Sequence, residues 1–222
     1  MSTVAHAVIA VAGLGSRLGR GMPKCLVEVA GRTIIEHQLE LLKEVPDVRV
    51  VVGYMEHEVI QRALAIRDDL TIVRNPDYRA TTTQRSYWLG ARFLTRPCLY
   101  LDGDIIFDER SFNDFMQAAA SRDRPLVGIT EVKTSHPVFA STLGADRPSS
   151  LQVGSFSRSQ HSTWEWANLA YLPPGMLEKD GGDVFKRLEG FLPLDAKSIH
   201  CFEVDTEDDL RQAEYFASRF EH

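Results

Sequence analysis

Residues 13–29 read GLGSRLGRGMPKCLVEV, and they follow directly on an apolar run at residues 4–12. The apolar run predicts a buried strand, and the glycines after it predict a tight loop. Such a loop can turn its backbone N–H groups toward phosphates, while Arg17 and Lys24 can neutralise a triphosphate. We therefore expect the nucleotide to be held by Ala12, Gly13, Leu14, Gly15 and Ser16.

The spacing within this loop excludes two common nucleotide-binding motifs. The third glycine of a dinucleotide-binding Rossmann fingerprint is replaced by Leu18. A Walker A loop requires a glycine before its lysine and a serine or threonine after it, and Lys24 has neither. The loop therefore indicates a nucleotide-binding protein of another class.

The rest of the chain alternates apolar runs with amphipathic segments, which is typical of βαβ units around a mostly parallel sheet. We expect one α/β domain over residues 1–222. Thr33 and Glu36 form a capping box that predicts the start of a helix. Between residues 131 and 160 the pattern loosens into short strands and turns, which we expect to cover one side of a cleft. The other expected strands cover residues 48–53, 70–73, 98–101, 126–129, 164–172 and 199–204, and the other helices cover residues 56–66, 83–93, 112–120, 183–188 and 206–220.

The composition is that of an ordinary soluble globular protein, with 44% hydrophobic and 25% charged residues. A formal net charge of -6 argues against nucleic acid or an anionic membrane as the main partner, because both favour an excess of Lys and Arg. The three cysteines have no metal-ligand spacing, and the first apolar run is short for a membrane span. We expect a cytoplasmic protein that is a monomer or a homodimer.

Acidic residues follow two of the apolar runs. Asp102 and Asp104 flank Gly103 after residues 98–101, and Asp205 follows residues 199–204. Because the carboxyl ends of parallel strands converge on the ligand crevice, we expect Asp104 and Asp205 to meet. An acidic pair beside a triphosphate would repel it unless a divalent cation lay between them, and Mg²⁺ prefers such oxygen ligands. The alternative is structural: a turn at Asp104 and a helix-terminal charge at Asp205.

The G-x-G-x-R loop and the later P-K-x-L at residues 23–26 resemble the signature of the nucleotidyltransferases with a Rossmann-like GT-A fold. That family includes sugar-1-phosphate nucleotidyltransferases, phosphocholine cytidylyltransferases and methylerythritol-phosphate cytidylyltransferases. Residues 52–54, 75–78 leading to Ser86, and 203–208 look like the phosphocholine branch. The resemblance implies a three-layer α/β/α fold of the nucleotide-diphospho-sugar transferase type, with an antiparallel, acceptor-side segment at about residues 131–172.

The resemblance also implies an activity, in which the NMP of a nucleoside triphosphate is joined to a small phosphorylated acceptor and pyrophosphate is released. It implies that Arg17 stabilises the triphosphate and that Lys24 bridges the acceptor phosphate and the α-phosphate. Asp104 and Asp205 match the two magnesium positions of the family. The remaining implied contacts are Gly53, Ser86 and Asp102 for the nucleotide, and Glu165 for the acceptor. Beside Glu165, Trp164 and Trp166 could supply aromatic walls for a sugar or a quaternary amine, so we expect Trp164 to contact the acceptor as well.

The nucleotide and the activity class stay open at this point. CTP is favoured, but the cytidylyl branch often carries Asn where this chain has Thr81-Thr82-Thr83, so GTP and UTP remain alternatives. A GT-A glycosyltransferase, with Asp102-Gly103-Asp104 as its metal-binding D-x-D, is one competing interpretation. A nucleotide-binding module without catalysis is the other.

Overall fold

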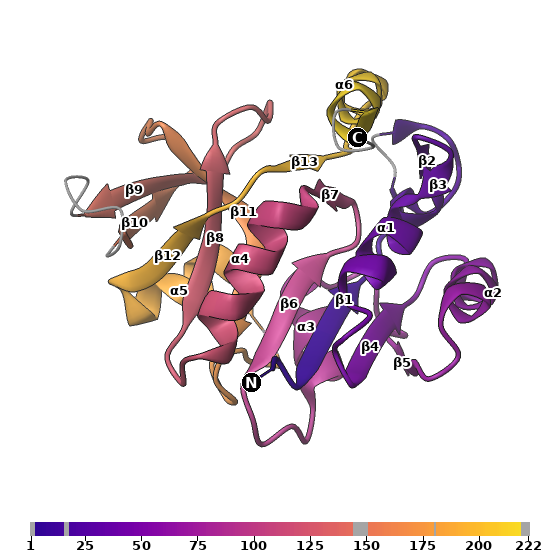
Figure 1. The fold of residues 1–222 in the computed structure, drawn as a ribbon, viewed down its shortest axis with the longest axis horizontal. Coiled ribbons are helices and arrows are strands. Elements are labelled where there is room, and N and C mark those ends of the chain that lie inside the picture. The colour runs from indigo at the N-terminus through magenta and orange to yellow at the C-terminus, as the bar shows by residue number, and fades with distance from the viewer. Residues whose placement is uncertain (1–2, 16–17, 144–150, 180, 219–222) are drawn as a thin grey trace.

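The central sheet is built outward from the strand that precedes the glycine loop. The structure is a computed structural model that describes residues 3–15, 18–143, 151–179 and 181–218. Within these ranges nine strands form one sheet (Figure 1). In spatial order they are β5 (Thr71–Arg74), β4 (Asp47–Val52), β1 (His6–Ala10), β6 (Cys98–Asp102), β11 (Trp164–Leu172), β8 (Leu126–Glu131), β12 (Leu194–Ser198), β10 (Gln152–Ser157) and β9 (Phe139–Leu143).

One half of the sheet is parallel. Strands β5, β4, β1 and β6 run in the same direction, and β1 lies between β4 and β6. Ala7, Val8 and Ile9 have no exposed surface, as expected for a parallel strand covered on both faces. Ala10 pairs with Asp102, so the carboxyl ends of β1 and β6 lie side by side.

The other half of the sheet is largely antiparallel. Strand β11 runs antiparallel to both β6 and β8, and β10 runs antiparallel to β12 and β9. Strand β12 is parallel to its neighbour β8. Together the two halves confirm the expected Rossmann-like α/β fold with an antiparallel excursion.

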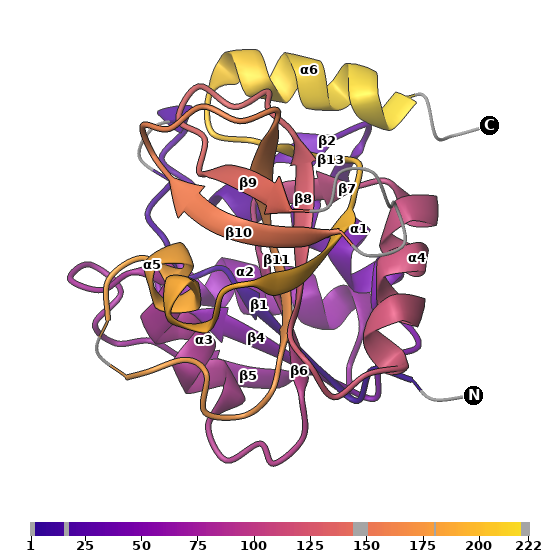
Figure 2. The ribbon, with the colours of Figure 1, turned by 90° about the vertical axis from the view of Figure 1, so that its left-hand side faces the viewer.

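Helices cover both faces of this sheet and give it three layers. Figures 1 and 2 show α1 and α4 on one face, with α3 and α5 on the other. The short 3-10 helices are η2 (Lys24–Leu26) and η4 (Glu189–Phe191). The α-helices are α1 (Ile34–Leu41), α2 (Glu56–Ile66), α3 (Thr83–Ala91), α4 (Glu109–Ala120), α5 (Val184–Leu188) and α6 (Glu207–Ser218).

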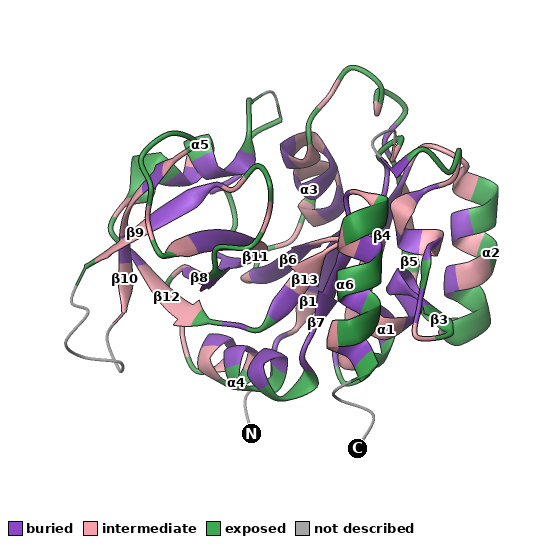
Figure 3. Ribbon diagram, turned by 90° about the horizontal axis from the view of Figure 1, so that it is seen from above, coloured by how far each residue is buried: buried purple, intermediate pink, exposed green. Residues whose placement is uncertain are grey.

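The two faces hold separate hydrophobic cores, because successive side chains of a strand point to opposite sides. Ile9 of β1 belongs to the core that contains Phe112 and Phe115 of α4. Its neighbour Val8 belongs to the core that contains Tyr87 of α3. Figure 3 shows the buried residues on the strands and on the inward sides of the helices.

The end of the chain differs from the sequence-based expectation. The expected last strand at residues 199–204 is β13 (Cys201–Glu203), which pairs antiparallel with β7 (Ile105–Phe107) outside the main sheet. The main sheet instead takes β12, which the sequence analysis did not predict. Polar residues explain the omission, since only Leu194 of the five residues in β12 is buried. A second two-stranded sheet pairs β2 (Glu28–Val29) with β3 (Arg32–Thr33).

Several local expectations are confirmed. Helix α2 and strand β11 have the expected bounds. The capping box at the start of α1 is present, because the Glu36 carboxylate accepts hydrogen bonds from the backbone N–H and the hydroxyl of Thr33 at 2.7 Å each. Thr206 caps α6, where its hydroxyl accepts from the backbone N–H of Asp209. None of the helices in the described ranges combines the length and the apolar character needed to cross a membrane.

The packing of α3 onto the sheet allows a test of the fold. A Cβ at Gly90 would lie 2.5 Å from Val8 Cγ1 and 2.9 Å from Val51 Cγ2. We expect Gly90→Ala to lower the free energy of unfolding by about 1–3 kcal/mol, because an overpacked core must shift. Urea denaturation measures the change. Gly190→Ala is the control, since nothing lies within 4 Å of its added Cβ. Equal stability of the two variants would contradict the close approach of α3.

Candidate active site

The glycine loop leaves β1 at the edge of the sheet where β1 and β6 end. Gly15 has a φ of +62°, and a Cβ there would lie 3.0 Å from the carbonyl oxygen of Met22 and 3.2 Å from Lys24 Cγ. Only glycine fits this return of the loop without strain. Ser16 and Arg17 lie outside the described residues. The hydroxyl of Tyr54, which follows β4, donates to the carbonyl of Gly21 at 3.1 Å and ties the loop to the sheet.

Lys24 is the cation at the centre of the site. Its ammonium nitrogen Nζ donates to Asp104 Oδ2 at 2.8 Å and also to Asp205 Oδ1. The side chains of Lys24, Asp104 and Asp205 expose only 14%, 20% and 11% of their surface, so water screens these charges little. Burial alone would lower the pKa of Lys24, but the charges and hydrogen bonds of the two aspartates outweigh it and raise that pKa. Lys24 is therefore a permanent cation.

Asp104 and Asp205 lie close together as expected, but a different pairing of strands brings them there. Asp104 lies in the turn between β6 and β7, and Asp205 follows β13. The antiparallel pairing of β13 with β7 brings them together, and the N–H of Val204 donates to the carbonyl of Asp104 at 2.8 Å. The expectation that Asp205 ends a strand of the parallel sheet is therefore wrong. The convergence comes from a separate two-stranded sheet.

Two buried side chains hold the turn at residues 102–104 in place. The fully buried Gln38 of α1 donates through Nε2 to the carbonyls of Asp102 at 2.8 Å and Ile105 at 2.9 Å. The Tyr87 hydroxyl donates to Asp102 Oδ1 at 2.6 Å. Between them Gly103 is required, since a Cβ there would lie 2.2 Å from a methyl group of Val11. The carboxylates thus project from a rigid turn.

Two adjoining cavities open beside Lys24. The central cavity, of about 380 Å³, extends from Lys24 toward Asn75 and Ser86. The loop cavity, of about 270 Å³, lies against the glycine loop and includes Gly13, Leu14 and Gly15. Both are lined by Ala10, Gly13, Lys24, Thr83, Asp102 and Asp104.

The central cavity contains several of the expected nucleotide contacts. Ala12, Gly13, Ser86 and Asp102 line it. The Asn75 side-chain amide donates to the hydroxyl oxygens of Ser86 and Thr81 at 3.1 Å each, which fixes a polar edge of the cavity.

Gly53 is not among the residues that line the central cavity, but it shapes the cavity indirectly. A Cβ at Gly53 would lie 2.8 Å from Tyr78 and 2.9 Å from the carbonyl of Ala12. Gly53 thus allows Tyr78, which does line the cavity, to approach the end of β1.

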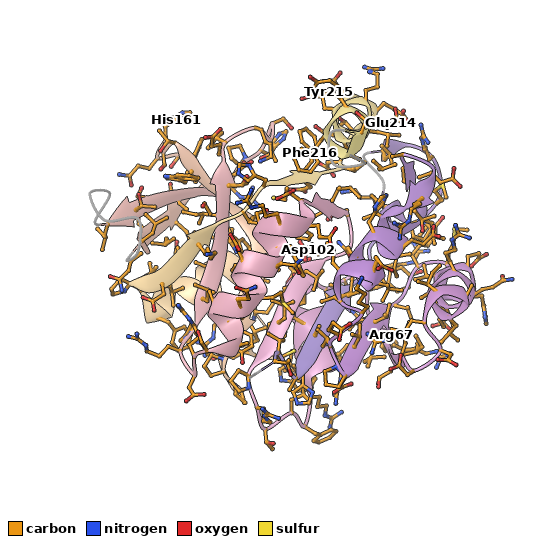
Figure 4. All side chains as sticks on the ribbon, in the orientation of Figure 1. Arg67, Asp102, His161, Glu214, Tyr215 and Phe216 are labelled. Carbon is orange, nitrogen blue, oxygen red and sulfur yellow. The ribbon has the colours of Figure 1, made fainter. Side chains whose placement is uncertain are left out.

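A third cavity, the outer cavity, of about 590 Å³, extends from Glu203 toward the loops around β9 and β10. Figure 4 places Asp102 near the middle of the molecule and His161 at the far end, beside β9. The outer cavity shares Val138, Arg158, Trp166, Asn168 and Glu203 with the central cavity. A ligand could therefore reach from the nucleotide side into the outer cavity.

The two expected acceptor contacts have different surroundings. Glu165 lines the outer cavity but is 2% exposed, and its carboxylate accepts from the Thr134 hydroxyl at 2.6 Å and from the N–H of Lys133 at 3.1 Å. It therefore holds the loop after β8. Trp164 lines a separate cavity beside α6, with Tyr215 and Phe216. Of the two tryptophans in β11, Trp166 is the one that lines the outer cavity.

Four acids, Asp102, Asp104, Glu203 and Asp205, gather around the single ammonium group of Lys24, and they disfavour each other's ionised forms. Burial, followed by the charge of Asp104, raises the pKa of Asp102 well above its ordinary value. Burial and the charge of Asp104 also raise the pKa of Glu203. A second cation is the natural complement of such a group.

The magnesium ion implied by the family resemblance fits these residues. Asp104 Oδ1 is buried and has no hydrogen-bond partner among the described residues. Across those residues no three His, Cys, Asp or Glu side chains form a ready-made metal cluster. An ion would thus be held by Asp104 and Asp205 together with oxygens of a substrate, as is common for Mg²⁺.

Comparison with known proteins identifies the class. Residues 7–155 match the model of the MobA-like NTP transferase domain. The chain therefore belongs to the MobA-like NTP transferase domain family, and the expected nucleotidyltransferase resemblance is confirmed. Its fold is similar to the solved structure of CTP:phosphocholine cytidylyltransferase from Streptococcus pneumoniae, with a TM-score of 0.76, 21% identity, and coverage of 97% of this chain and 99% of that one.

Two curated relatives are more similar in sequence over shorter spans. CMP-5'-(3-aminopropyl)phosphonate synthase of Streptomyces rubellomurinus is 38% identical over 137 residues, which are 55% of this chain and 22% of that protein. The 2-C-methyl-D-erythritol 4-phosphate cytidylyltransferase of Aeromonas hydrophila is 32% identical over 102 residues, which are 42% of each. The matches thus span less than half the length of either relative.

Some residues of the site were not predicted from the sequence. Gln38 left a signal, because it is a polar residue on the apolar face that Ile35 and Leu39 define. Asn168 left the same kind of signal, because it interrupts an apolar strand, whereas Arg158 left none, because it lies in an irregular polar segment. Their places depend on how β10 and β11 fold over the cleft.

The Lys24 ion pairs lead to a prediction about stability. We expect Lys24→Ala to lower the melting temperature in EDTA, because two poorly screened carboxylates lose their shared cation, a loss of about 3–5 kcal/mol for a buried pair. Adding MgCl₂ should raise the melting temperature of the variant more than that of the wild type. Differential scanning calorimetry in both buffers measures this. If MgCl₂ left the melting temperature of the variant unchanged, a cation site between the aspartates would be contradicted.

Proposed function

We propose that this protein transfers CMP from CTP to a small acceptor that ends in a phosphate or phosphonate, with release of pyrophosphate. The observation that carries the proposal is the position of Lys24, between Asp104 and Asp205 and at the junction of the central and loop cavities. Family membership supports nucleotidyl transfer over glycosyl transfer or binding alone.

The proposed reaction joins two anions, so positioning and charge neutralisation are the main tasks. An oxygen of the acceptor attacks the α-phosphorus of CTP, the bond from that phosphorus to the bridging oxygen of the β-phosphate breaks, and pyrophosphate leaves. The attacking oxygen needs no general base, because a phosphate is already ionised at neutral pH. Lys24 would place its charge between the two reactants.

The glycine loop and the aspartates would divide the remaining work. Backbone N–H groups at Gly13, Leu14 and Gly15 would face the β- and γ-phosphates in the loop cavity. Arg17, which lies outside the described residues, is proposed to neutralise the same phosphates. Asp104 and Asp205 would hold Mg²⁺, which when bound withdraws negative charge from the phosphate oxygens.

The choice of CTP rests on the relatives. The Streptomyces protein is named for a CMP-linked product, and the Aeromonas enzyme and the Streptococcus structure are cytidylyltransferases. In this chain the polar edge formed by Asn75 and Ser86 could hydrogen-bond a pyrimidine or its ribose. GTP and UTP remain alternatives for the same cavity.

A grid of substrates tests the proposed function. The protein is mixed with Mg²⁺ and each of CTP, UTP, GTP and ATP, together with phosphocholine, aminoalkylphosphonates or sugar 1-phosphates. Pyrophosphate release is then followed. We expect release with CTP and at least one acceptor, and at least about ten times less with the other nucleotides, since a mispaired buried polar group loses about 1–3 kcal/mol. Absence of pyrophosphate in every combination would overturn the function.

The proposed metal site makes a separate prediction. We expect Asp104→Asn and Asp205→Asn each to lower turnover by about 10²-fold or more and to shift the magnesium titration to higher concentration, because each loses one anionic ligand. Steady-state rates over a range of MgCl₂ measure both effects. Asp208→Asn is the matched control, since this exposed acid on α6 pairs with Arg211 instead. Wild-type magnesium curves for both site variants would remove the metal assignment.

A further inference from the structure

Glu203 places a carboxylate at the junction of the central and outer cavities. It lines both cavities, and the described residues include no lysine, arginine or histidine within salt-bridge distance of it. Lys24 is already shared by Asp104 and Asp205. Because an acidic group alone does not define a site, the surrounding residues must show what it would bind.

The backbone beside Glu203 is distorted in a way that aims a side chain at it. The pairing of β11 with β8 shifts register between Trp166 and Ala170, and Asn168 in this bulge has a φ of +48°. Its side-chain amide donates to Glu203 Oε2 at 3.4 Å. Left-handed residues and bulges near a cleft commonly serve to direct a side chain. Here they orient the Glu203 carboxylate.

Trp166 adds an independent sign of a ligand. It lines both cavities and is only 8% exposed. Its indole N–H is buried and has no hydrogen-bond acceptor among the described residues. Buried donors are normally paired, so an oxygen of a bound ligand is the expected partner. The face of an indole ring also attracts ammonium groups.

Arg158 supplies positive charge to the same space. It lines both cavities. Its guanidinium lies 5.4 Å from the centre of the Phe185 ring and donates to the carbonyl of His136 at 2.5 Å. No described carboxylate forms a salt bridge with it. A guanidinium in this position suits a phosphate or phosphonate.

We infer that the acceptor is a zwitterion, in which a phosphate or phosphonate is joined by a short chain to an ammonium group. This inference rests on the proposed function. Arg158 and the indole N–H of Trp166 meet the anionic end, while the carboxylate of Glu203, oriented by Asn168, meets the ammonium. A sugar phosphate could offer Glu203 hydroxyl hydrogen bonds but no positive charge to neutralise its carboxylate.

Matched ligands test this inference directly. 2-Aminoethylphosphonate and 3-aminopropylphosphonate are titrated by calorimetry into the protein with Mg²⁺ and a non-hydrolysable CTP analogue. Ethylphosphonate and propylphosphonate, which lack only the amine, are titrated in parallel. We expect at least one amine to bind about ten times more tightly than its partner, as is typical of one charge-assisted hydrogen bond.

Variants assign the difference to Glu203. Glu203→Gln should bring each amine within about three-fold of its amine-free partner, because it keeps the shape and removes the charge. Glu131→Gln is the matched control, an exposed acid that lines the cavity beside α6, and it should keep the full preference.

The outcomes separate this inference from the proposed function. Equal binding within each pair in the wild type, or a preference that survives Glu203→Gln, would overturn the zwitterionic acceptor. Pyrophosphate release that is fastest with a sugar 1-phosphate would overturn it too, while leaving nucleotidyl transfer intact. Absence of pyrophosphate release with every nucleotide and acceptor would overturn both.

Discussion

The ion pairs of Lys24 with Asp104 and Asp205 are the interaction on which the rest of the site depends. They join the end of the glycine loop, the turn after β6 and the segment after β13, which are far apart in the sequence. Two carboxylates with so little exposed surface would repel each other strongly without a cation. The fold must therefore hold them together through its backbone, and the pairing of β13 with β7 does so.

This constraint explains why buried polar residues gather around one turn. Gln38 is fully buried on α1, and its side-chain amide donates hydrogen bonds to the carbonyls of Asp102 and Ile105. Tyr87 places its hydroxyl against Asp102 from the opposite core. Both layers of helices thus donate hydrogen bonds to the turn between β6 and β7. Desolvating these groups costs free energy, and in return the turn presents its carboxylates without needing to reorganise.

The sequence predicted what depends on local pattern. The glycine loop, the capping box at Thr33 and the run that became β11 all follow from neighbouring residues. Strand β12 was missed because its residues are mostly polar, and β13 was placed in the wrong sheet because its pairing with β7 is long-range. Likewise, the alternation of side chains along a strand puts Trp164 and Trp166 on one face of β11. The sequence alone could not predict that Trp166 lines the outer cavity while Trp164 lines the separate cavity beside α6.

The two halves of the sheet constrain function unequally. The family model ends at residue 155, so it covers β1, β4 and β6, and the central and loop cavities lie at the carboxyl ends of β1 and β6. Arg158, Trp166, Asn168 and Glu203 lie beyond that span. Family membership therefore speaks to the triphosphate chemistry and much less to the acceptor. In the proposed acceptor site, the bulge in β11 orients Glu203, and the opposite charges of Arg158 and Glu203 would select an acceptor that carries both signs.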